Sequence, residues 1–336
     1  MKKNDYFKLT IAQQRTILEQ TATKRGLPKQ AIEKDLWVTA LLQIIFNMPC
    51  ADKFVFKGGT SLSKVWGLIN RFSEDIDLGI NRSFFNLDGD ISKNRLSKLR
   101  KKSSLYVRDE LCPMLVDAIN QTPLKELCQI EPEPDSIGEN PYNDPRSIFV
   151  NYESIFTDHL SYLPSIVRIE AGARTITEPY ETATLSSMVE QAFPTISTTI
   201  ATPIVKTAIA EKTFLEKAFL LHELFSVRNE VEAQRKSRHM YDLRMMMKKG
   251  IDNKALSNDE LWEAIRHSRS MLTPMQGVNY MADIRKNIQL IPPKESLANW
   301  RKDFEEMSSS MIYGEKPVFE ELLESMNWLE LLFKKA

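Results

Sequence analysis

The sequence has few cysteines and no long apolar run. Its three cysteines, Cys50, Cys112 and Cys128, are odd in number and have no metal-type spacing, so we expect reduced thiols in a cytoplasmic protein. The first residues, MKKNDYFKLT, contain no apolar segment, and no signal peptide is expected. No stretch reaches the roughly 18 uncharged apolar residues of a membrane span, so we expect no membrane partner.

Net charge is also absent, because 45 basic residues balance 45 acidic ones. A protein that binds nucleic acid over its whole surface would be clearly basic, so any such contact must come from a local patch. The 336 residues, 42% hydrophobic and 27% charged, are typical of a globular protein large enough for two lobes. Glycine is scarce, with 11 residues, so the adjacent pair Gly58 and Gly59 calls for an explanation.

The order of hydrophobic patterns predicts an α+β fold. A mixed β-sheet lobe with flanking helices is expected over 1–190, followed by a mostly helical lobe over 191–336. An extended segment is expected at 197–205. Helices are predicted at 8–25, 28–47, 92–121, 183–192, 207–226, 236–249, 258–272, 295–307 and 317–334, with a further helix opening at Thr60, and strands at 53–56, 75–80, 129–133, 147–152 and 165–171.

Two carboxylates, Asp75 and Asp77, are two residues apart on a predicted strand. Side chains alternate between the two faces of a strand, so these two lie on one face, where they repel each other unless a cation lies between them. Mg²⁺ (or Mn²⁺) is a suitable cation, because it is held by one or two carboxylates together with substrate phosphates. In the alternative interpretation, Asp77 faces solvent at a strand end and Asp75 caps a turn.

The glycine pair follows a strand and precedes a predicted helix, in the order Lys57-Gly58-Gly59-Thr60-Ser61. Backbone N–H groups and the helix dipole at such a turn favour a phosphate, and glycine allows it to come close. The hydroxyls of Thr60 and Ser61 can add donors. A plain strand–turn–helix with capping residues is the alternative.

A glycine turn followed by Asp-x-Asp resembles the nucleotidyltransferase superfamily related to DNA polymerase beta. In that superfamily a third carboxylate usually follows on a later strand, and Glu170 stands in an apolar–acid–apolar context. The alternative is a half-exposed acid paired with Arg168 or Arg174.

Several blocks in the same order make the chain similar to the AbiEii/AbiGii family of toxin nucleotidyltransferases, from about residue 30 to 332. The blocks are Glu33-Lys34-Asp35-Leu36-Trp37, Phe56-Lys57-Gly58-Gly59-Thr60-Ser61, Arg71-Phe72-Ser73-Glu74-Asp75-Ile76-Asp77, Arg168-Ile169-Glu170-Ala171-Gly172-Ala173-Arg174, Lys212-Thr213-Phe214-Leu215-Glu216-Lys217 and Ser237-Arg238-His239-Met240-Tyr241-Asp242-Leu243.

The resemblance implies a nucleotidyltransferase-type fold and a toxin that works within a toxin–antitoxin or abortive-infection pair. It implies an NTP substrate and, for some members, the acceptor end of tRNA. The alternatives are an acceptor hydroxyl on a small molecule or a protein, and a non-enzymatic interaction module with a relic site. The metal and nucleotide site would fall on the glycine turn with Asp75 and Asp77, and further catalytic residues on Lys217 and Asp242. Lys212 stands where the family usually has arginine, which keeps the charge but loses bidentate phosphate geometry.

Lys217 and Asp242 also have simpler interpretations. Lys217 borders the apolar stripe of its predicted helix, from which it can reach a triphosphate or pair with Glu216 or Glu223 as a surface lysine. Asp242 can hold Lys217 in place or form an ordinary pair with Arg238 within its helix.

A basic stretch without acids marks the start of the predicted helix at 92–121. It can bind RNA phosphates or form a solvated helix face. Its basic residues are Lys93, Arg95, Lys98, Arg100, Lys101 and Lys102.

Overall fold

A computed structural model describes residues 4–137, 141–158, 163–198, 200–227 and 233–336. The chain divides into two compact units. The first comprises Met1–Val65 and Phe72–Thr207, and the second comprises Trp66–Arg71 and Ala208–Ala336. The division therefore follows Thr207 rather than residue 190, and a short segment after the glycine turn belongs to the second unit.

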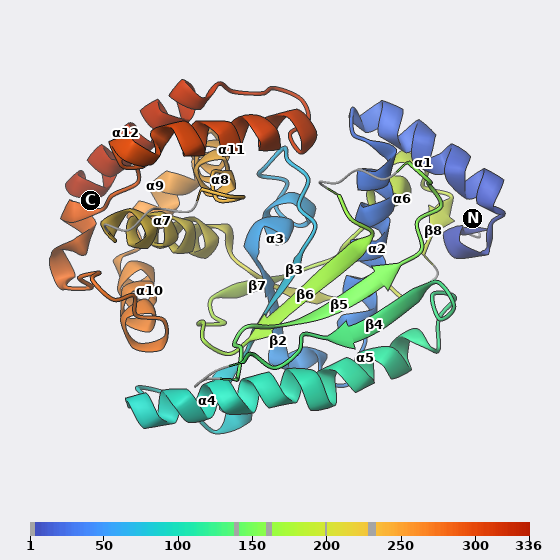
Figure 1. Cartoon of the computed structure of the whole chain (residues 1–336), viewed down its shortest axis with the longest axis horizontal. Helices are drawn as coiled ribbons and strands as arrows, with labels where there is room; N and C mark the ends of the chain where they lie inside the picture. The colour runs from blue at the N-terminus through green and yellow to red at the C-terminus, as the bar shows by residue number, and fades with distance from the viewer. Residues whose placement is uncertain (1–3, 138–140, 159–162, 199, 228–232) are drawn as a thin grey trace. The chain divides into compact units, whose positions relative to one another are not determined.

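The first unit is built on a seven-stranded mixed sheet with the order β4-β5-β6-β3-β2-β9-β7 (Figure 1). At its centre, β3 runs antiparallel to β2 and parallel to β6. The fold class expected from the sequence is thereby confirmed. The strands are β2 (Phe54–Lys57), β3 (Ile76–Ile80), β4 (Cys128–Pro132), β5 (Arg146–Tyr152), β6 (Ile166–Gly172), β7 (Tyr180–Ala183) and β9 (Val205–Ala208), and a separate two-stranded sheet joins β1 (Asn4–Asp5) to β8 (Ile196–Ser197).

Helices of the first unit bury their apolar faces against one another and the sheet. In α2 (Lys29–Ile45) every residue from Gln30 to Ile45 is buried, which explains its dense apolar sequence. α1 (Ile11–Arg25) begins with a Thr10 capping box. The helix predicted at 92–121 is α4 (Lys93–Tyr106), a π-helical turn, and α5 (Cys112–Ile119).

The prediction of a helix over 183–192 is wrong in its first half. Residues up to Ala183 form the edge strand β7, and α6 (Met188–Ala192) starts only after Ser187. The side chain of Ser187 accepts from the Glu190 amide, and Glu190 bonds back to the Ser187 amide. This capping box fixes the helix start.

The described part of the second unit is mainly helical, as expected. α9 had not been predicted, and β9 occupies the start of the helix predicted at 207–226. Among the described residues, no helix combines the length and apolar character that a membrane span needs. The helices are α7 (Ala210–Ser226), α8 (Arg238–Met247), α9 (Ile251–Leu256), α10 (Asp259–Leu272), α11 (Leu297–Ser310) and α12 (Phe319–Lys335).

Candidate active site

The glycine turn joins β2 directly to α3 (Gly58–Lys64). Gly58 has φ +78°, a conformation that L-residues with side chains rarely adopt. A Cβ atom at this position would lie 2.0 Å from Asp77 Oδ2. The turn therefore needs glycine both for its backbone conformation and for the approach of Asp77.

The hydroxyls of Thr60 and Ser61 already have partners within the protein. Both residues are buried. Thr60 donates to the backbone oxygen of Asp75 at 2.5 Å, and Ser61 donates to that of Gly58 at 2.8 Å. These side chains fix the turn and the start of the Asp-x-Asp strand. Phosphate contact in this turn would thus depend on backbone N–H groups and Lys57.

Three charged residues lie side by side across the centre of the sheet. Asp77 on β3 is in register with Lys57 on β2 and with Glu170 on β6. Residues paired in this way project to the same face. Lys57 has no ion pair in the parts of the chain that the structure describes. The sequence placed these residues far apart, and strand pairing brings them together.

Arg168 neutralises part of this carboxylate cluster. Its Nη2 lies 3.0 Å from Asp75 Oδ2 and its Nη1 lies 2.8 Å from Glu170 Oε1. Burial, together with the nearby negative charge of Asp77 and Asp75, raises the pKa of Glu170 to about 7. The pairing of Glu170 with Arg168, considered as an alternative from the sequence, is therefore present alongside the carboxylate cluster.

The donor chemistry of this cluster suits a hard divalent cation, because its ligand atoms are carboxylate oxygens. In the described residues, however, no group of three or more His, Cys, Asp or Glu side chains is arranged as a metal site. Arg168 lies between Asp75 and Glu170 instead. The assignment of Asp75, Asp77 and Glu170 as metal ligands therefore stays a prediction.

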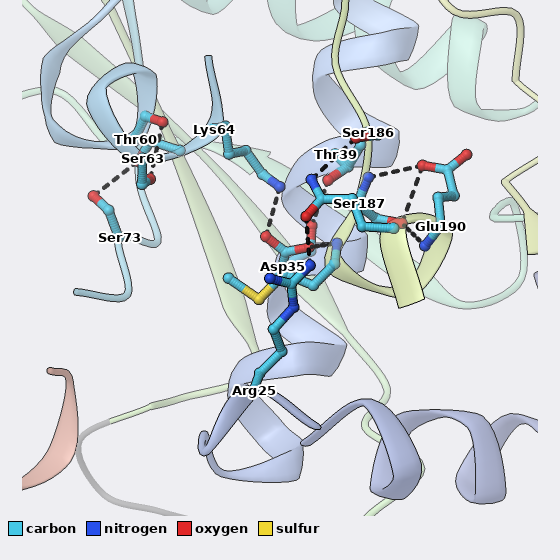
Figure 2. A network of polar contacts seen from close by, with 12 residues as sticks. Arg25, Asp35, Thr39, Thr60, Ser63, Lys64, Ser73, Ser186, Ser187 and Glu190 are labelled. Carbon is cyan, nitrogen blue, oxygen red and sulfur yellow. Dashed lines mark hydrogen bonds and ion pairs between the residues drawn. The ribbon is translucent and has the colours of Figure 1, made fainter. Parts of the chain in front are cut away.

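Two buried ion pairs attach α2 to both sides of the candidate site. Lys34 Nζ lies 2.5 Å from Glu74 Oε2, next to Asp75 in the chain. Lys64, the last residue of α3, lies 2.5 Å from Asp35 Oδ1. Figure 2 shows Lys64 pointing at Asp35, near the start of α6. Neighbouring residues of α2 thus hold the glycine-turn helix and the segment before Asp75.

Lys217 and Asp242 meet within the second unit. Lys217 Nζ lies 2.9 Å from Asp242 Oδ2, and Arg71 donates to both carboxylate oxygens of Asp242 at 2.7 and 2.8 Å. Asp242 is fully buried and only 8% of the Lys217 side chain is exposed. Lys217 is therefore not a surface lysine. The arginine that pairs with Asp242 is Arg71, where the simpler interpretation had Arg238.

Excess positive charge surrounds Asp242. Burial, offset in part by Asp242, lowers the pKa of Lys217. Burial and the neighbouring cation of Lys217 lower the pKa of His239 well below its usual value, so this histidine is neutral near pH 7. Lys212, which replaces the usual arginine, is fully buried with its Nζ 4.0 Å from Glu216 Oε1.

The basic residues predicted for RNA contact all lie on α4. Lys102 Nζ donates to the Phe85 backbone oxygen at 3.2 Å, and Lys101 Nζ lies 5.3 Å from the centroid of the Tyr142 ring. Arg100 is half-buried. The other five residues, Lys93, Arg95, Lys98, Lys101 and Lys102, are exposed.

Sequence reasoning had not assigned a site role to Lys34, Glu74, Arg71 or the Arg168–Asp75 contact. Lys34, Glu74 and Arg71 do belong to the blocks that carry the family resemblance. Their partners lie 40 to 171 positions away in the chain, so spacing alone gives no indication of the contacts.

The chain is similar to a known protein family and to a solved structure. The model of the family described as "Nucleotidyl transferase AbiEii toxin, Type IV TA system" matches residues 40–325. No curated protein sequence matches. A solved structure similar to this chain is MenT4, a nucleotidyltransferase toxin from Mycobacterium tuberculosis H37Rv, with 14% identity and a TM-score of 0.45 over 97% of this chain and 98% of that one.

Proposed function

The chain belongs to the AbiEii family of nucleotidyltransferase toxins of type IV toxin–antitoxin systems, and we propose that it transfers a nucleotide from a Mg²⁺-bound (or Mn²⁺-bound) NTP to an acceptor hydroxyl. The preferred acceptor in this proposal is the 3′ end of tRNA. The hydroxyl attacks the α-phosphate, a new P–O bond forms, and pyrophosphate leaves with the electrons of the broken P–O bond.

One observation carries the proposal. Asp77 contacts the glycine turn and stands in register between Lys57 and Glu170. A phosphate held by the backbone N–H groups of Gly58 and Gly59 would thus lie beside the carboxylates. Positioning and charge neutralisation at one place are the main requirements of such a transfer.

Asp75, Asp77 and Glu170 are the residues that would hold the divalent cation. When bound, such an ion supplies charge neutralisation for the phosphates and lowers the pKa of an attacking hydroxyl. Arg168 also pairs with Asp75 and Glu170. It would therefore share these carboxylates with the metal.

Lys217 and Asp242 remain proposed catalytic residues on the strength of the family resemblance. Lys217 supplies a positive charge suited to a triphosphate, and Asp242 orients it through the 2.9 Å ion pair. An antitoxin protein is the proposed partner of the toxin, as the family description implies. The three free thiols of Cys50, Cys112 and Cys128 suit the proposed location in the reducing cytoplasm.

A labelling assay tests the transfer reaction. Purified protein is incubated with each α-labelled NTP, Mg²⁺ or Mn²⁺, and either tRNA, total RNA, a protein extract or a small-molecule extract. We expect label on tRNA from the wild type and none from Asp77→Asn. Asp117→Asn is the matched control, because Asp117 is exposed on α5 of the same unit.

Full labelling by Asp77→Asn would refute the proposed site. Label found only on protein or on a small molecule would keep the site and change the acceptor. Growth inhibition on expression provides a second readout, which Asp77→Asn should abolish and Asp117→Asn should retain.

A further inference from the structure

Two arginines and one aspartate of the first unit lie together beyond the carboxylates already described. Asp144 is buried, and its Oδ1 accepts from the Ser103 hydroxyl and the Ala173 amide, each at 3.0 Å. Arg174 Nε lies 3.3 Å from Asp144 Oδ2. Arg100 precedes Ser103 by three residues on α4, on the same helix face, and it interacts electrostatically with Asp144 and Arg174.

This cluster contains a buried polar atom that the described residues leave without a hydrogen bond. Arg100 Nε has no partner among them, whereas the buried atoms Arg174 Nε and Asp144 Oδ2 face each other at 3.3 Å. Such atoms carry a desolvation cost unless a water or a ligand pairs with them. Two guanidinium groups face a single carboxylate, so the cluster has a surplus positive charge.

The neighbouring Arg146 has protein partners for its guanidinium group. Arg146 is 1% exposed. Its Nε and Nη2 donate to the backbone oxygen of Glu133, and its Nη1 donates to Ser104 and pairs with Asp135. The donors of Arg146 are thus paired within the protein, whereas Arg100 Nε is buried without a hydrogen-bond partner among the described residues.

The cluster lies on the face of the sheet that carries Asp77 and Glu170. Gly172 is two residues beyond Glu170 on β6, and strand geometry places it on the same face about 7 Å further along. A Cβ atom on Gly172 would lie 2.5 Å from Asp144 Oδ1. Asp144 therefore covers the sheet one step beyond Glu170, and Arg174 lies directly beside Asp144.

We propose that Arg100 and Arg174 bind a backbone phosphate of the acceptor RNA, next to the nucleotide whose hydroxyl is used. Arginine matches phosphate oxygens through paired N–H donors. A phosphodiester would accept from Arg100 and balance the surplus positive charge of the two arginines. Because this site lies beyond Glu170, it serves the acceptor, and the triphosphate remains with the glycine turn. The inference rests on the proposed transfer to RNA.

Binding measurements on the full chain test this assignment. Affinity for a labelled tRNA transcript is measured by anisotropy across a salt series, and affinity for each Mg²⁺–NTP by calorimetry. For Arg174→Gln and for Arg100→Gln we expect tRNA affinity about tenfold lower and a salt slope smaller by about 0.7. NTP affinity should not change. Arg15→Gln, an exposed arginine on α1 of the same unit, is the matched control.

A substitution that removes a negative charge from the cluster distinguishes phosphate binding from a folding defect. Asp144→Asn keeps the shape and the acceptor oxygen for Ser103 and Ala173 but removes the negative charge. It should raise tRNA affinity and steepen the salt slope, which misfolding would not do.

Three results would overturn the inference. If tRNA binding is unchanged in both arginine variants while the wild type binds and labels tRNA, the acceptor-phosphate site is wrong and the proposed function stands. If only NTP affinity falls, the phosphate belongs to the triphosphate. A wild type that binds NTP but neither binds nor labels RNA would instead refute the acceptor in the proposed function, and this inference with it.

Discussion

Asp77 Oδ2 lies so close to the backbone of Gly58 that a Cβ atom added there would be 2.0 Å away. The glycine turn and the second aspartate of Asp-x-Asp are separated by 18 residues between Gly58 and Asp77. The antiparallel pairing of β2 with β3 brings them together. The turn and the carboxylate are therefore one unit, and a change in either should disturb the other.

Gly58→Ala tests this contact. Alanine is strained at φ +78° and pushes the Asp77 carboxylate aside, so we expect loss of nucleotide transfer and about 2 kcal/mol or more of destabilisation. Gly26→Ala is the control, since Gly26 has φ +65° but open space around its Cβ position. Gly26→Ala should lower the free energy of unfolding, measured in urea, by about 1–2 kcal/mol and retain nucleotide transfer. Equal activity in the two variants would contradict the importance of the contact.

Thr60→Val distinguishes a structural from a phosphate-binding hydroxyl. The variant removes the part-buried hydrogen bond to the Asp75 backbone oxygen, so we expect about 1–3 kcal/mol lower stability together with reduced transfer. Thr60→Ser keeps the donor and should restore most of both. If the Thr60 hydroxyl contacts NTP, Thr60→Val should instead weaken NTP binding and leave the free energy of unfolding unchanged.

The raised pKa of Glu170 predicts that the stability of the metal-free protein depends on pH. This pKa is about 7, above the ordinary 4.5, so the folded state binds more protons than the unfolded state between these values. Stability should then fall as the pH rises from about 4.5 through 7. Comparing urea unfolding at pH 5.5 and 8 with and without Glu170→Gln isolates this contribution. If the variant shows the same pH slope as the wild type, the raised pKa is not that of Glu170.

Binding of a divalent cation should release a proton from the same carboxyl. Calorimetry of Mg²⁺ or Mn²⁺ binding near pH 7 in buffers of different ionisation enthalpy should detect the proton in the wild type and lose it in Glu170→Gln. Absence of proton release from the wild type near pH 7 would argue against Glu170 as a ligand.

Substitutions of Asp242 and Lys217 should lower the free energy of unfolding by different amounts. Asp242→Ala leaves Arg71 and Lys217 buried without their carboxylate, so we expect about 3–5 kcal/mol of destabilisation. Lys217→Met leaves Asp242 paired with Arg71 and should cost less. If Lys217 serves the triphosphate, Lys217→Met should weaken Mg²⁺–NTP binding by calorimetry, whereas Lys125→Met at an exposed position should not. Unchanged NTP affinity would leave Lys217 a structural residue.

The sequence by itself determined the local chemistry of the site. A strand, a glycine pair and two aspartates of period two are local features, because backbone conformation and side-chain alternation depend on neighbouring residues. The ordered blocks also identified the family, and the order of hydrophobic patterns predicted the α+β class; the family match and the strand order confirm them.

Only the tertiary structure decided which distant residues share a face. Register places Glu170 beside Asp77, Arg168 spans Asp75 and Glu170, and Arg71 lies beside Asp242. It also showed that Thr60 and Ser61 hold the backbone. Strand pairing and ion pairs join residues across long stretches of chain, and their geometry depends on packing that no local pattern encodes.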